Sequence, residues 1–246
     1  MPYYFGVYHW RRRLRAIVLG ALGVAVATAL AVGSRSRFRR LLAVGLALWG
    51  GRTGWRAASR LARPAPWRLD RGKYEAFAAE LPLDAADRVL DVGCGTGRSL
   101  VGMAPALDSA ATVVGLDVFD DRVILGNAPT LAARNASRAG LDAAVVRGDA
   151  ARLPVADGSI DVVTACRMLH DLPAPAARRA LAEAHRACAP DGTLGVLELP
   201  ITHDGSTDPA TYWRELVTEA GFTVTTVTEL ELERERGRYV VVVAEP

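Results

Sequence analysis

The segment of residues 89–99 constrains the fold of this chain more than any other. It begins with VLDV, which is apolar except for Asp91, continues with GCGTG, and ends in residues suited to a helix. Glycine adopts backbone conformations that other residues resist, and it lets a ligand approach the main chain closely. The sequence therefore predicts a buried strand, a tight turn and a helix, with a ligand-binding site at the turn.

From residue 71 onward, short β-rich runs alternate with alanine-rich helical stretches, a pattern typical of a parallel sheet covered by helices. The expected strands are 88–92, 112–117, 143–147, 160–165, 193–199, 223–230 and 239–244. The expected helices are 71–81, 98–107, 128–139, 174–188 and 208–220. Asn127 is the expected N-cap of helix 128–139, Gly140 its stop, and Glu231–Gly237 the turn between the last two strands. We therefore expect an α/β fold with a doubly wound, seven-stranded, mostly parallel sheet that contains one reversed strand.

The charged residues divide the chain into two unlike parts. Residues 1–69 contain 13 Arg and neither Asp nor Glu, whereas the remainder contains 17 basic and 27 acidic residues, a net charge of −10. The basic excess lies among apolar runs, so the pI near 9.0 is no argument for nucleic-acid binding, and we expect none. Residues 52–69, which include Pro64 and Pro66, are the expected connector. We place a domain boundary near residue 68, between an Arg-rich membrane-anchor region, 1–68, and a globular domain, 69–246.

Composition narrows the class of protein further. Half of the residues are apolar and 23% are charged, which excludes a globally disordered chain. The three cysteines, Cys94, Cys166 and Cys188, are too few and too scattered for a disulfide framework or a four-ligand zinc site. We therefore expect no metal site.

An uncharged run of Ala, Val, Leu, Ile and Gly extends over residues 16–34, with Arg on both sides. A helix of these 19 residues spans roughly 28 Å, close to the hydrocarbon core of a bilayer. A second uncharged run, 41–51, has 11 residues; it either crosses a thin bilayer with snorkelling Arg side chains or lies at the interface. The sequence predicts membrane attachment through a transmembrane helix at about 16–34.

Three topologies remain open for this region. A two-helix hairpin with both ends in the cytoplasm places eight Arg inside and four outside, which the positive-inside rule prefers. The alternatives are a single anchor helix and a cleaved signal peptide, whose Arg-rich start and small residues near Ala29–Ala31 have some support.

The run VLDVGCGTG, residues 89–97, resembles the first motif of the class I S-adenosylmethionine-dependent methyltransferases, hydrophobic-hydrophobic-D/E-x-G-x-G-x-G. Two further segments, LPVADGSIDVV (153–163) and APDGTL (189–194), are similar to the family's entries into its fourth and fifth strands. The resemblance continues in order over about 71–246. It implies a Rossmann-like methyltransferase fold and S-adenosylmethionine as the cofactor.

The resemblance also implies which residues bind that cofactor. Asp117 ends the second strand, where family members bind the ribose hydroxyls, and Asp149 and Ala150 follow the third strand, where they contact the adenine. A carboxylate accepts hydrogen bonds from both ribose hydroxyls. Asp91 either touches the ligand or braces the turn through hydrogen bonds. The expected cofactor-binding residues are Asp91, Gly93, Gly95, Gly97, Asp117, Asp149 and Ala150.

The sequence gives weaker indications for residues near the methyl acceptor than for residues that bind the cofactor. The segment CRMLHD, residues 166–171, follows the fourth strand, where family members place residues near the methyl acceptor. His170 is either a general base, since imidazole titrates near neutrality, or a structural histidine. His203 and Asp204 either border the acceptor pocket or lie in a plain loop, and Asp120 and Asp121 either line the cofactor mouth or are solvated. We assign no catalytic residue, because an in-line methyl displacement depends chiefly on positioning.

The segment after the fourth strand has neither an Asn/Asp-Pro-Pro-Tyr tetrapeptide nor a Pro-Cys pair, and it resembles the small-molecule and quinone or lipid branch of the family. We expect a methyltransferase at the cell membrane that acts on a small-molecule or lipid acceptor. Its catalytic domain would lie in the cytoplasm, where the donor is made, which disfavours the signal peptide. The alternatives are a catalytically inactive cofactor-binding protein tethered to the membrane and a nicotinamide-dependent reductase, which the glycine spacing disfavours.

Overall fold

The computed structural model describes residues 3–32, 36–61, 65–232 and 237–246, and the chain divides into two compact units. The first, here called the sheet unit, contains Leu69–Phe119 and Asn127–Pro246. The second, the hairpin unit, contains the described residues up to Arg68 together with the segment Asp120–Gly126. The chain therefore leaves the sheet unit after Phe119 and returns to it at Asn127.

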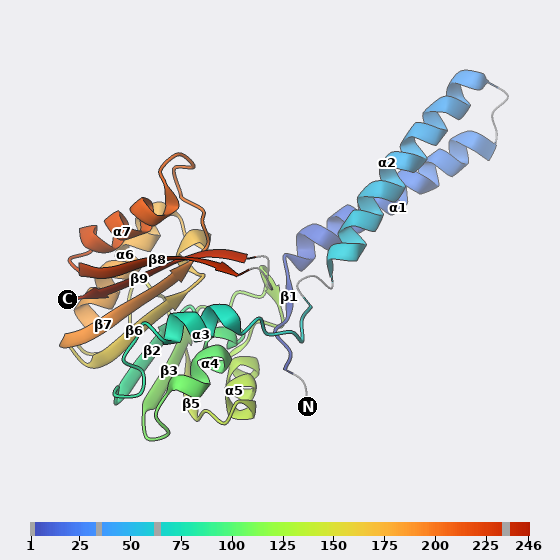
Figure 1. The fold of residues 1–246 in the computed structure, drawn as a ribbon. Coiled ribbons are helices and arrows are strands. Elements are labelled where there is room, and N and C mark those ends of the chain that lie inside the picture. The colour runs from blue at the N-terminus through green and yellow to red at the C-terminus, as the bar shows by residue number, and fades with distance from the viewer. Residues whose placement is uncertain (1–2, 33–35, 62–64, 233–236) are drawn as a thin grey trace. The chain divides into compact units, whose positions relative to one another are not determined.

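The sheet unit contains one seven-stranded sheet in the order β5-β3-β2-β6-β7-β9-β8. Its strands are β2 (Arg88–Val92), β3 (Thr112–Asp117), β5 (Ala143–Arg147), β6 (Ile160–Cys166), β7 (Cys188–Glu198), β8 (Thr223–Leu232) and β9 (Gly237–Glu245). Neighbouring strands are parallel from β5 to β7, whereas β9 runs antiparallel to both β7 and β8 (Figure 1). The predicted doubly wound, mostly parallel sheet with one reversed strand is confirmed.

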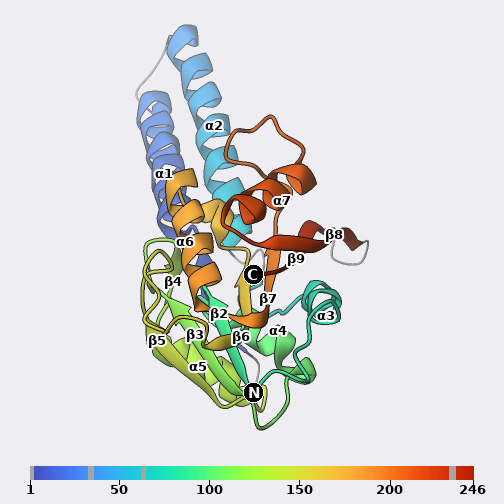
Figure 2. The same ribbon diagram turned by 90° about the vertical axis from the view of Figure 1, so that its left-hand side faces the viewer.

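Helices cover both faces of this sheet (Figure 2). On one face lie α3 (Gly72–Ala78), α4 (Arg98–Met103) and α5 (Pro129–Arg138), and on the other lie α6 (Ala174–Ala187) and α7 (Pro209–Glu219). Successive residues of a strand point to opposite faces, so Val89 and Leu90 of β2 belong to different hydrophobic clusters. Because both faces are buried, the central strands are nearly continuous apolar runs, which is why the sequence pattern identified them.

Three elements of the sheet unit differ from their predicted bounds by three residues or more at one end, and the others by one or two residues at most. The helix expected over 98–107 ends at Met103 and continues as a short 3-10 helix, because Pro105 lacks the N–H of a regular α-helix. The helix expected over 71–81 is the shorter α3, and β7 begins at Cys188, five residues before the predicted start at 193. Within the predicted turn Glu231–Gly237, residues 233–236 lie outside the described part of the chain.

The start of α5 also differs from the prediction. Asn127 is not its N-cap: Ala128 occupies that position, and Pro129 follows as the first helical residue, where its missing N–H costs nothing. The Asn127 side chain approaches Asp117 instead. Gly140 ends the helix with φ +79°, as the sequence predicted.

The hairpin unit is built on two antiparallel helices, α1 (Trp10–Val32) and α2 (Arg37–Leu61), that pack along each other. The predicted second apolar segment, 41–51, lies inside α2, and the segment after it, expected as a connector, is helical as far as Leu61. The end of the predicted helix 16–34 falls on residues 33–34 and part of the connector on 62–64, which lie outside the described residues.

A small two-stranded sheet completes the hairpin unit. Its strands, β1 (Val7–Tyr8) and β4 (Ile124–Leu125), are antiparallel, and beyond them the His9 N–H donates to the Val123 carbonyl oxygen at 2.7 Å. The sequence did not predict this pairing, because each strand has two residues and no periodic pattern. The pairing attaches the segment Asp120–Gly126 to the start of the chain.

The helix hairpin buries small residues and exposes large apolar ones. A Cβ atom added to Gly20 would lie 2.6 Å from the Gly50 carbonyl oxygen, so the two backbones are in contact there. By contrast, the side chains of Leu22, Leu41 and Trp55 are 56%, 72% and 74% exposed. The buried residues of the two helices are Gly20, Gly23, Ala27, Ala43, Gly50 and Ala57.

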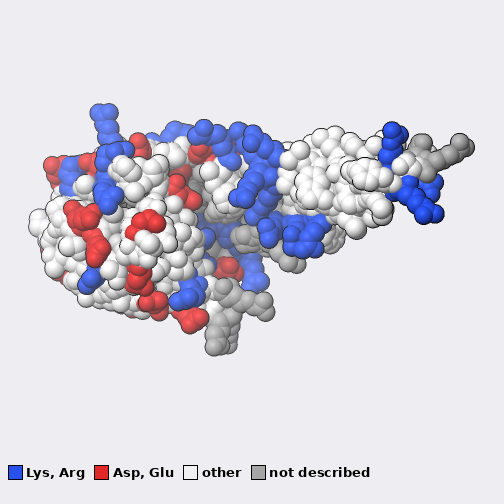
Figure 3. Space-filling view, turned by 90° about the horizontal axis from the view of Figure 1, so that it is seen from above, with Lys and Arg blue, Asp and Glu red and all other residues white. Residues whose placement is uncertain are grey.

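Basic side chains gather at both ends of the hairpin, and the surface between them is uncharged (Figure 3). Near the closed end, α2 begins with Arg37, Arg39 and Arg40. Near the open end lie Arg11, Arg12, Arg13 and Arg15 of α1 and Arg52, Arg56 and Arg60 of α2. Within the described part of the chain, α1 is the one helix whose length and mean hydropathy, 2.1, suffice to cross a membrane.

Candidate functional site

The carboxyl ends of β2, β3, β5 and β6 lie at one edge of the sheet. From β2 the chain proceeds to β3 and β5 on one side of the sheet, and it then continues with β6 and β7 on the other side. Parallel α/β sheets bind their ligands at such a switch point, outside the carboxyl ends of the strands. Every cofactor-binding residue expected from the sequence lies in β2, at the end of β3, or in the turns after β2 and β5.

The turn after β2 needs glycine for both conformation and space. Gly93 and Gly97 have φ values of +74° and +80°, in the left-handed region that favours glycine. A Cβ atom on Gly93 would lie 2.6 Å from Cγ of Met168, and one on Gly97 would lie 3.0 Å from the Ala132 carbonyl oxygen. The turn is therefore tight, and it leads directly into α4, whose N-cap is Gly97.

Asp117 faces this turn. Its Oδ2 atom accepts a hydrogen bond from the Gly95 N–H at 3.0 Å, and its Oδ1 atom accepts one from the Phe119 N–H at 2.6 Å. Phe119 itself has φ +54°, which is uncommon for a large side chain and is a form of backbone strain that clusters at functional sites. The structure therefore brings the end of β3 and the glycine turn together.

Asn127 is a neighbour of Asp117 that the sequence did not predict. Its Nδ2 atom lies 3.4 Å from Asp117 Oδ1. The residue is 8% exposed, and its Oδ1 atom is buried without a hydrogen-bond partner among the described residues. An unsatisfied buried acceptor costs about 1–3 kcal/mol, and a hydrogen-bond donor of a bound ligand would remove that cost. The sequence pointed to Asn127 only as a helix cap, and no motif marks it.

Asp91 connects three elements beneath the turn. Its Oδ1 atom accepts a hydrogen bond from Thr164 Oγ1 on β6 at 2.9 Å, and its Oδ2 atom accepts one from the Ser99 hydroxyl on α4. Complete burial raises the pKa of Asp91 to about 7, against the two hydrogen bonds, which lower it. Asp91 was expected either to touch the cofactor or to brace the turn. These hydrogen bonds support the bracing role, and contact with the cofactor stays a prediction.

Asp149 and Ala150 follow β5 at the same edge. The Gly148 N–H donates to the main-chain oxygen of Asp117 at 3.0 Å, which holds this turn beside the end of β3. The Asp149 side chain is exposed, and its Oδ1 atom accepts a hydrogen bond from the Ala151 N–H at 2.9 Å. Ala150 is buried. The turn therefore presents one exposed carboxylate and one buried methyl group near Asp117.

On the acceptor side, His170 pairs with Glu198, the last residue of β7. The Nδ1 atom of His170 lies 2.6 Å from Glu198 Oε2, and Glu198 Oε1 accepts a hydrogen bond from the Leu169 N–H at 2.7 Å. Burial lowers the pKa of His170, but the hydrogen bond and the charge of Glu198 outweigh it, and the net pKa is raised. No motif marks Glu198, and its only signal in the sequence is an acidic residue at the end of an apolar strand. Arg167, the residue after β6, has φ +57°, a backbone conformation that is uncommon for residues other than glycine.

The hydrogen bonds of His203 tie its loop to α7 and to the segment after β6. Its Nδ1 atom lies 2.6 Å from the Tyr212 hydroxyl, and its Nε2 atom lies 2.8 Å from the Leu172 carbonyl oxygen. Because a carbonyl only accepts, Nε2 carries the proton and Nδ1 accepts from Tyr212. Asp204 accepts a hydrogen bond from the Thr207 hydroxyl at 2.5 Å. These contacts favour the plain-loop role for both residues.

Residues 89–192 match the family model described as a methyltransferase domain. The matched range begins in β2 and ends inside β7, so it includes the glycine turn, Asp117, Asp149 and His170. The resemblance to the methyltransferases is thereby confirmed for this part of the chain.

Two methyltransferases of known name are similar in sequence to about half of this chain. The chain is 32% identical over 127 residues to a demethylmenaquinone methyltransferase of Lactobacillus johnsonii, covering 52% of this chain and 50% of that protein. It is 36% identical over 122 residues to a 27-O-demethylrifamycin SV methyltransferase of Amycolatopsis mediterranei, covering 49% of this chain and 41% of that protein. The chain thus spans half or less of the length of these relatives.

Solved structures share the fold of the sheet unit. One is the crystal structure of a SAM-dependent methyltransferase from Aquifex aeolicus, with a TM-score of 0.56 and 22% sequence identity. The similarity covers 73% of this chain and 92% of that one. At this level of identity the similarity supports the architecture, the Rossmann-like methyltransferase fold.

Proposed function

We propose that this protein, whose residues 89–192 match the methyltransferase domain, transfers a methyl group from S-adenosylmethionine to a small-molecule acceptor at a membrane. In this proposal residues 69–246 form the catalytic domain and lie in the cytoplasm, and residues 1–68 form the membrane anchor. The observation that carries the proposal is the position of Asp117 against the glycine turn, beside the buried, unsatisfied Asn127 Oδ1 atom.

The residues at the carboxyl edge of the sheet fit the cofactor. The hydroxyls of the ribose donate hydrogen bonds, so they suit the Asp117 carboxylate, and one of them can satisfy the Asn127 acceptor. Gly93 and Gly95 of the turn are partly exposed, and glycine lets a ligand approach the main chain closely there. Asp149 and Ala150 border the same edge from β5, where they would hold the adenine.

The cofactor supplies an electrophilic methyl group on a cationic sulfur, and the protein supplies orientation. On the acceptor side, His170 is the residue best placed to handle a proton. Since the Glu198 carboxylate only accepts hydrogen bonds, Nδ1 of His170 carries a proton, and Nε2 is left as the basic atom. We infer that His170 receives a proton at Nε2 from an acceptor hydroxyl, and that Glu198 fixes the ring.

The helix hairpin supports membrane attachment. A hairpin in water buries its large apolar side chains, whereas helices in a bilayer pack through small residues and expose the large ones to lipid. Here glycine and alanine lie between the helices, and Leu22, Leu41 and Trp55 face outward. Arg side chains near both ends suit the two headgroup layers.

The names of the relatives support a small and lipid-soluble acceptor. One relative is named for demethylmenaquinone and another for a demethylated rifamycin. A membrane anchor would keep the catalytic domain close to acceptors dissolved in the bilayer. We therefore propose a lipid-soluble small molecule as the acceptor class.

The test is methyl transfer from labelled S-adenosylmethionine into a lipid extract, with the full chain in detergent. We expect label in one lipid-soluble product, and no product with the Asp117→Ala variant. Asp142→Ala removes an exposed carboxylate and serves as the matched control. No label with any extract, in a protein that still binds the cofactor, would favour a catalytically inactive cofactor-binding protein instead.

A further inference from the structure

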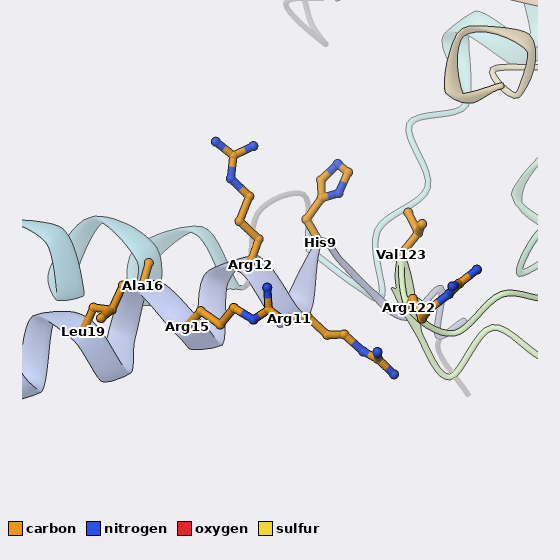
Figure 4. A pocket seen from close by; sticks show the side chains of 8 residues that line it. All are labelled: His9, Arg11, Arg12, Arg15, Ala16, Leu19, Arg122 and Val123. Atoms are coloured by element: carbon orange, nitrogen blue, oxygen red, sulfur yellow. The ribbon is translucent and has the colours of Figure 1, made fainter. Parts of the chain in front are cut away.

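We propose that the open end of the helix hairpin binds the phosphate of an anionic phospholipid headgroup. The site is an open pocket of about 520 Å³ formed entirely within the hairpin unit. Figure 4 shows its lining from the first turns of α1 and from the segment next to β4. The lining includes four arginines, Arg11, Arg12, Arg15 and Arg122, and the apolar residues Ala16 and Leu19.

Two of the four guanidinium groups are held by carboxylates. Arg122 pairs with Asp120 at 2.5 Å, and the hydrogen bonds from Arg122 lower the pKa of Asp120 to about 2, so this acid stays ionised. Arg11 lies 3.7 Å from an oxygen of Asp121. Asp120 and Asp121, expected either to line the cofactor mouth or to be solvated, form ion pairs within the hairpin unit. The negative charges of Asp120 and Asp121 therefore offset the positive charges of Arg122 and Arg11.

The other two arginines leave the pocket positively charged. Neither Arg12 nor Arg15 has a carboxylate within 4.0 Å among the described residues. Both lie in the first two turns of α1, which has no acidic residue in its first turn. The positive end of a helix dipole disfavours cations there, so an anion bound in the pocket would stabilise both the side chains and the helix end.

The apolar part of the lining favours a lipid over a free phosphate. Leu19 is 55% exposed and continues into the uncharged surface of α1. A ligand that reaches from the arginines to Leu19 is therefore anionic at one end and apolar at the other. Phospholipids have this chemistry, and basic pockets at the ends of membrane helices bind their headgroups.

The test uses the full chain reconstituted in phosphatidylcholine vesicles that contain a minor fraction of phosphatidylglycerol. After extraction into mild detergent and purification, the ratio of the two lipids retained by the protein is measured. We expect enrichment of phosphatidylglycerol over its share in the vesicles. Since each arginine near a membrane contributes roughly a fivefold factor, the double variant Arg12→Gln/Arg15→Gln should lose on the order of twentyfold of that enrichment.

The matched control is Arg52→Gln/Arg56→Gln, which removes two exposed charges at the same end of the hairpin but outside the pocket. It should retain most of the enrichment; an equal loss in both variants would show a diffuse charge effect and overturn the site. Displacement of the lipid by soluble glycerol phosphate would overturn the choice of a lipid.

The proposed headgroup site depends on the proposed membrane attachment. A vesicle flotation assay tests the attachment separately from the headgroup site. A protein that fails to float with pure phosphatidylcholine vesicles refutes the attachment, and the headgroup site with it. A protein that floats without enriching phosphatidylglycerol refutes the headgroup site alone.

Discussion

Asp91 and Asp117 belong to neighbouring strands, but their surroundings assign them different tasks. Asp91 is wholly buried and accepts hydrogen bonds from two hydroxyl groups, those of Ser99 and Thr164. Asp117 accepts hydrogen bonds from two main-chain N–H groups and from the amide of Asn127, and it is only partly buried. A carboxylate of the first kind is suited to bracing the fold, and one of the second kind is accessible to a ligand.

The raised pKa of Asp91 predicts a pH-dependent stability. Its folded-state pKa of about 7 exceeds the ordinary value of 3.8, so the folded state binds the proton more tightly than the unfolded state. That contribution is complete below about pH 4 and is lost as the pH rises to about 7. Asp91→Asn should therefore gain stability relative to the wild type across this range, by up to about 4 kcal/mol.

The measurement is the difference in the free energy of unfolding between wild type and variant as a function of pH. The exposed control Asp142→Asn should give a flat difference. A flat difference for Asp91→Asn as well would mean that Asp91 stays ionised in the folded protein.

The pair of His170 and Glu198 predicts a shifted titration. Because Glu198 raises the pKa of His170, the ring should titrate above its ordinary value of 6.5. Glu198→Gln removes the charge and keeps an amide oxygen, so the pKa of His170 should fall and the acid limb of the rate profile should move to lower pH. NMR titration of the ring and the pH dependence of kcat measure the two effects. An unchanged limb with a shifted ring pKa would exclude His170 as the base.

At the scale of residues, the sequence indicates the candidate site residues that belong to a recognisable motif and gives no sign of the others. The glycine turn and Asp117 were identified because their spacing follows one strand and its successor. Glu198 contacts residues 28 and 29 positions away, and Asn127 lies 10 positions from Asp117. No local pattern encodes these contacts, since the packing of the sheet creates them.

At the scale of elements, the close approach of α1 and α2 depends on glycine. A Cβ atom on Gly20 would lie 2.6 Å from a backbone oxygen, whereas one on Gly51 would have no neighbour within 4 Å. Gly20→Ala should therefore separate the helices, and Gly51→Ala should leave them in place and stabilise α2 by about 1 kcal/mol.

Spin labels at the exposed positions Val26 and Val44 report the separation of the two helices in detergent. We expect a longer or broader distance distribution for Gly20→Ala and an unchanged one for Gly51→Ala. Equal distributions in both variants would argue against backbone contact at Gly20.

The elements that the sequence predicted best are the buried strands, because a strand covered on both faces is an uninterrupted apolar run. The pairing of β1 with β4 was not predictable, because each strand has two residues and more than 100 residues, including β2 and β3, separate them along the chain. Helix ends were displaced where a single proline, such as Pro105, competes with the periodic pattern.

At the scale of the whole molecule, the division of charge predicts a topology. With both ends of the hairpin in the cytoplasm, the arginines at its closed end, Arg37, Arg39 and Arg40, lie on the opposite side of the membrane. In sealed vesicles with the cytoplasmic face outward, trypsin should digest the sheet unit and leave these sites intact until detergent is added. Cleavage at these sites in sealed vesicles would instead support a single membrane span.

The central claim is that the glycine turn and the carboxylates that flank it hold one adenosyl group. Isothermal titration of the full chain in detergent with S-adenosylhomocysteine, the demethylated cofactor, tests it most directly. We predict one binding site, retained in Asp142→Ala and weakened roughly tenfold to a hundredfold in Asp117→Ala, because a hydrogen-bonded charge is lost. Binding to Asp117→Ala with the affinity of the wild type would contradict the claim.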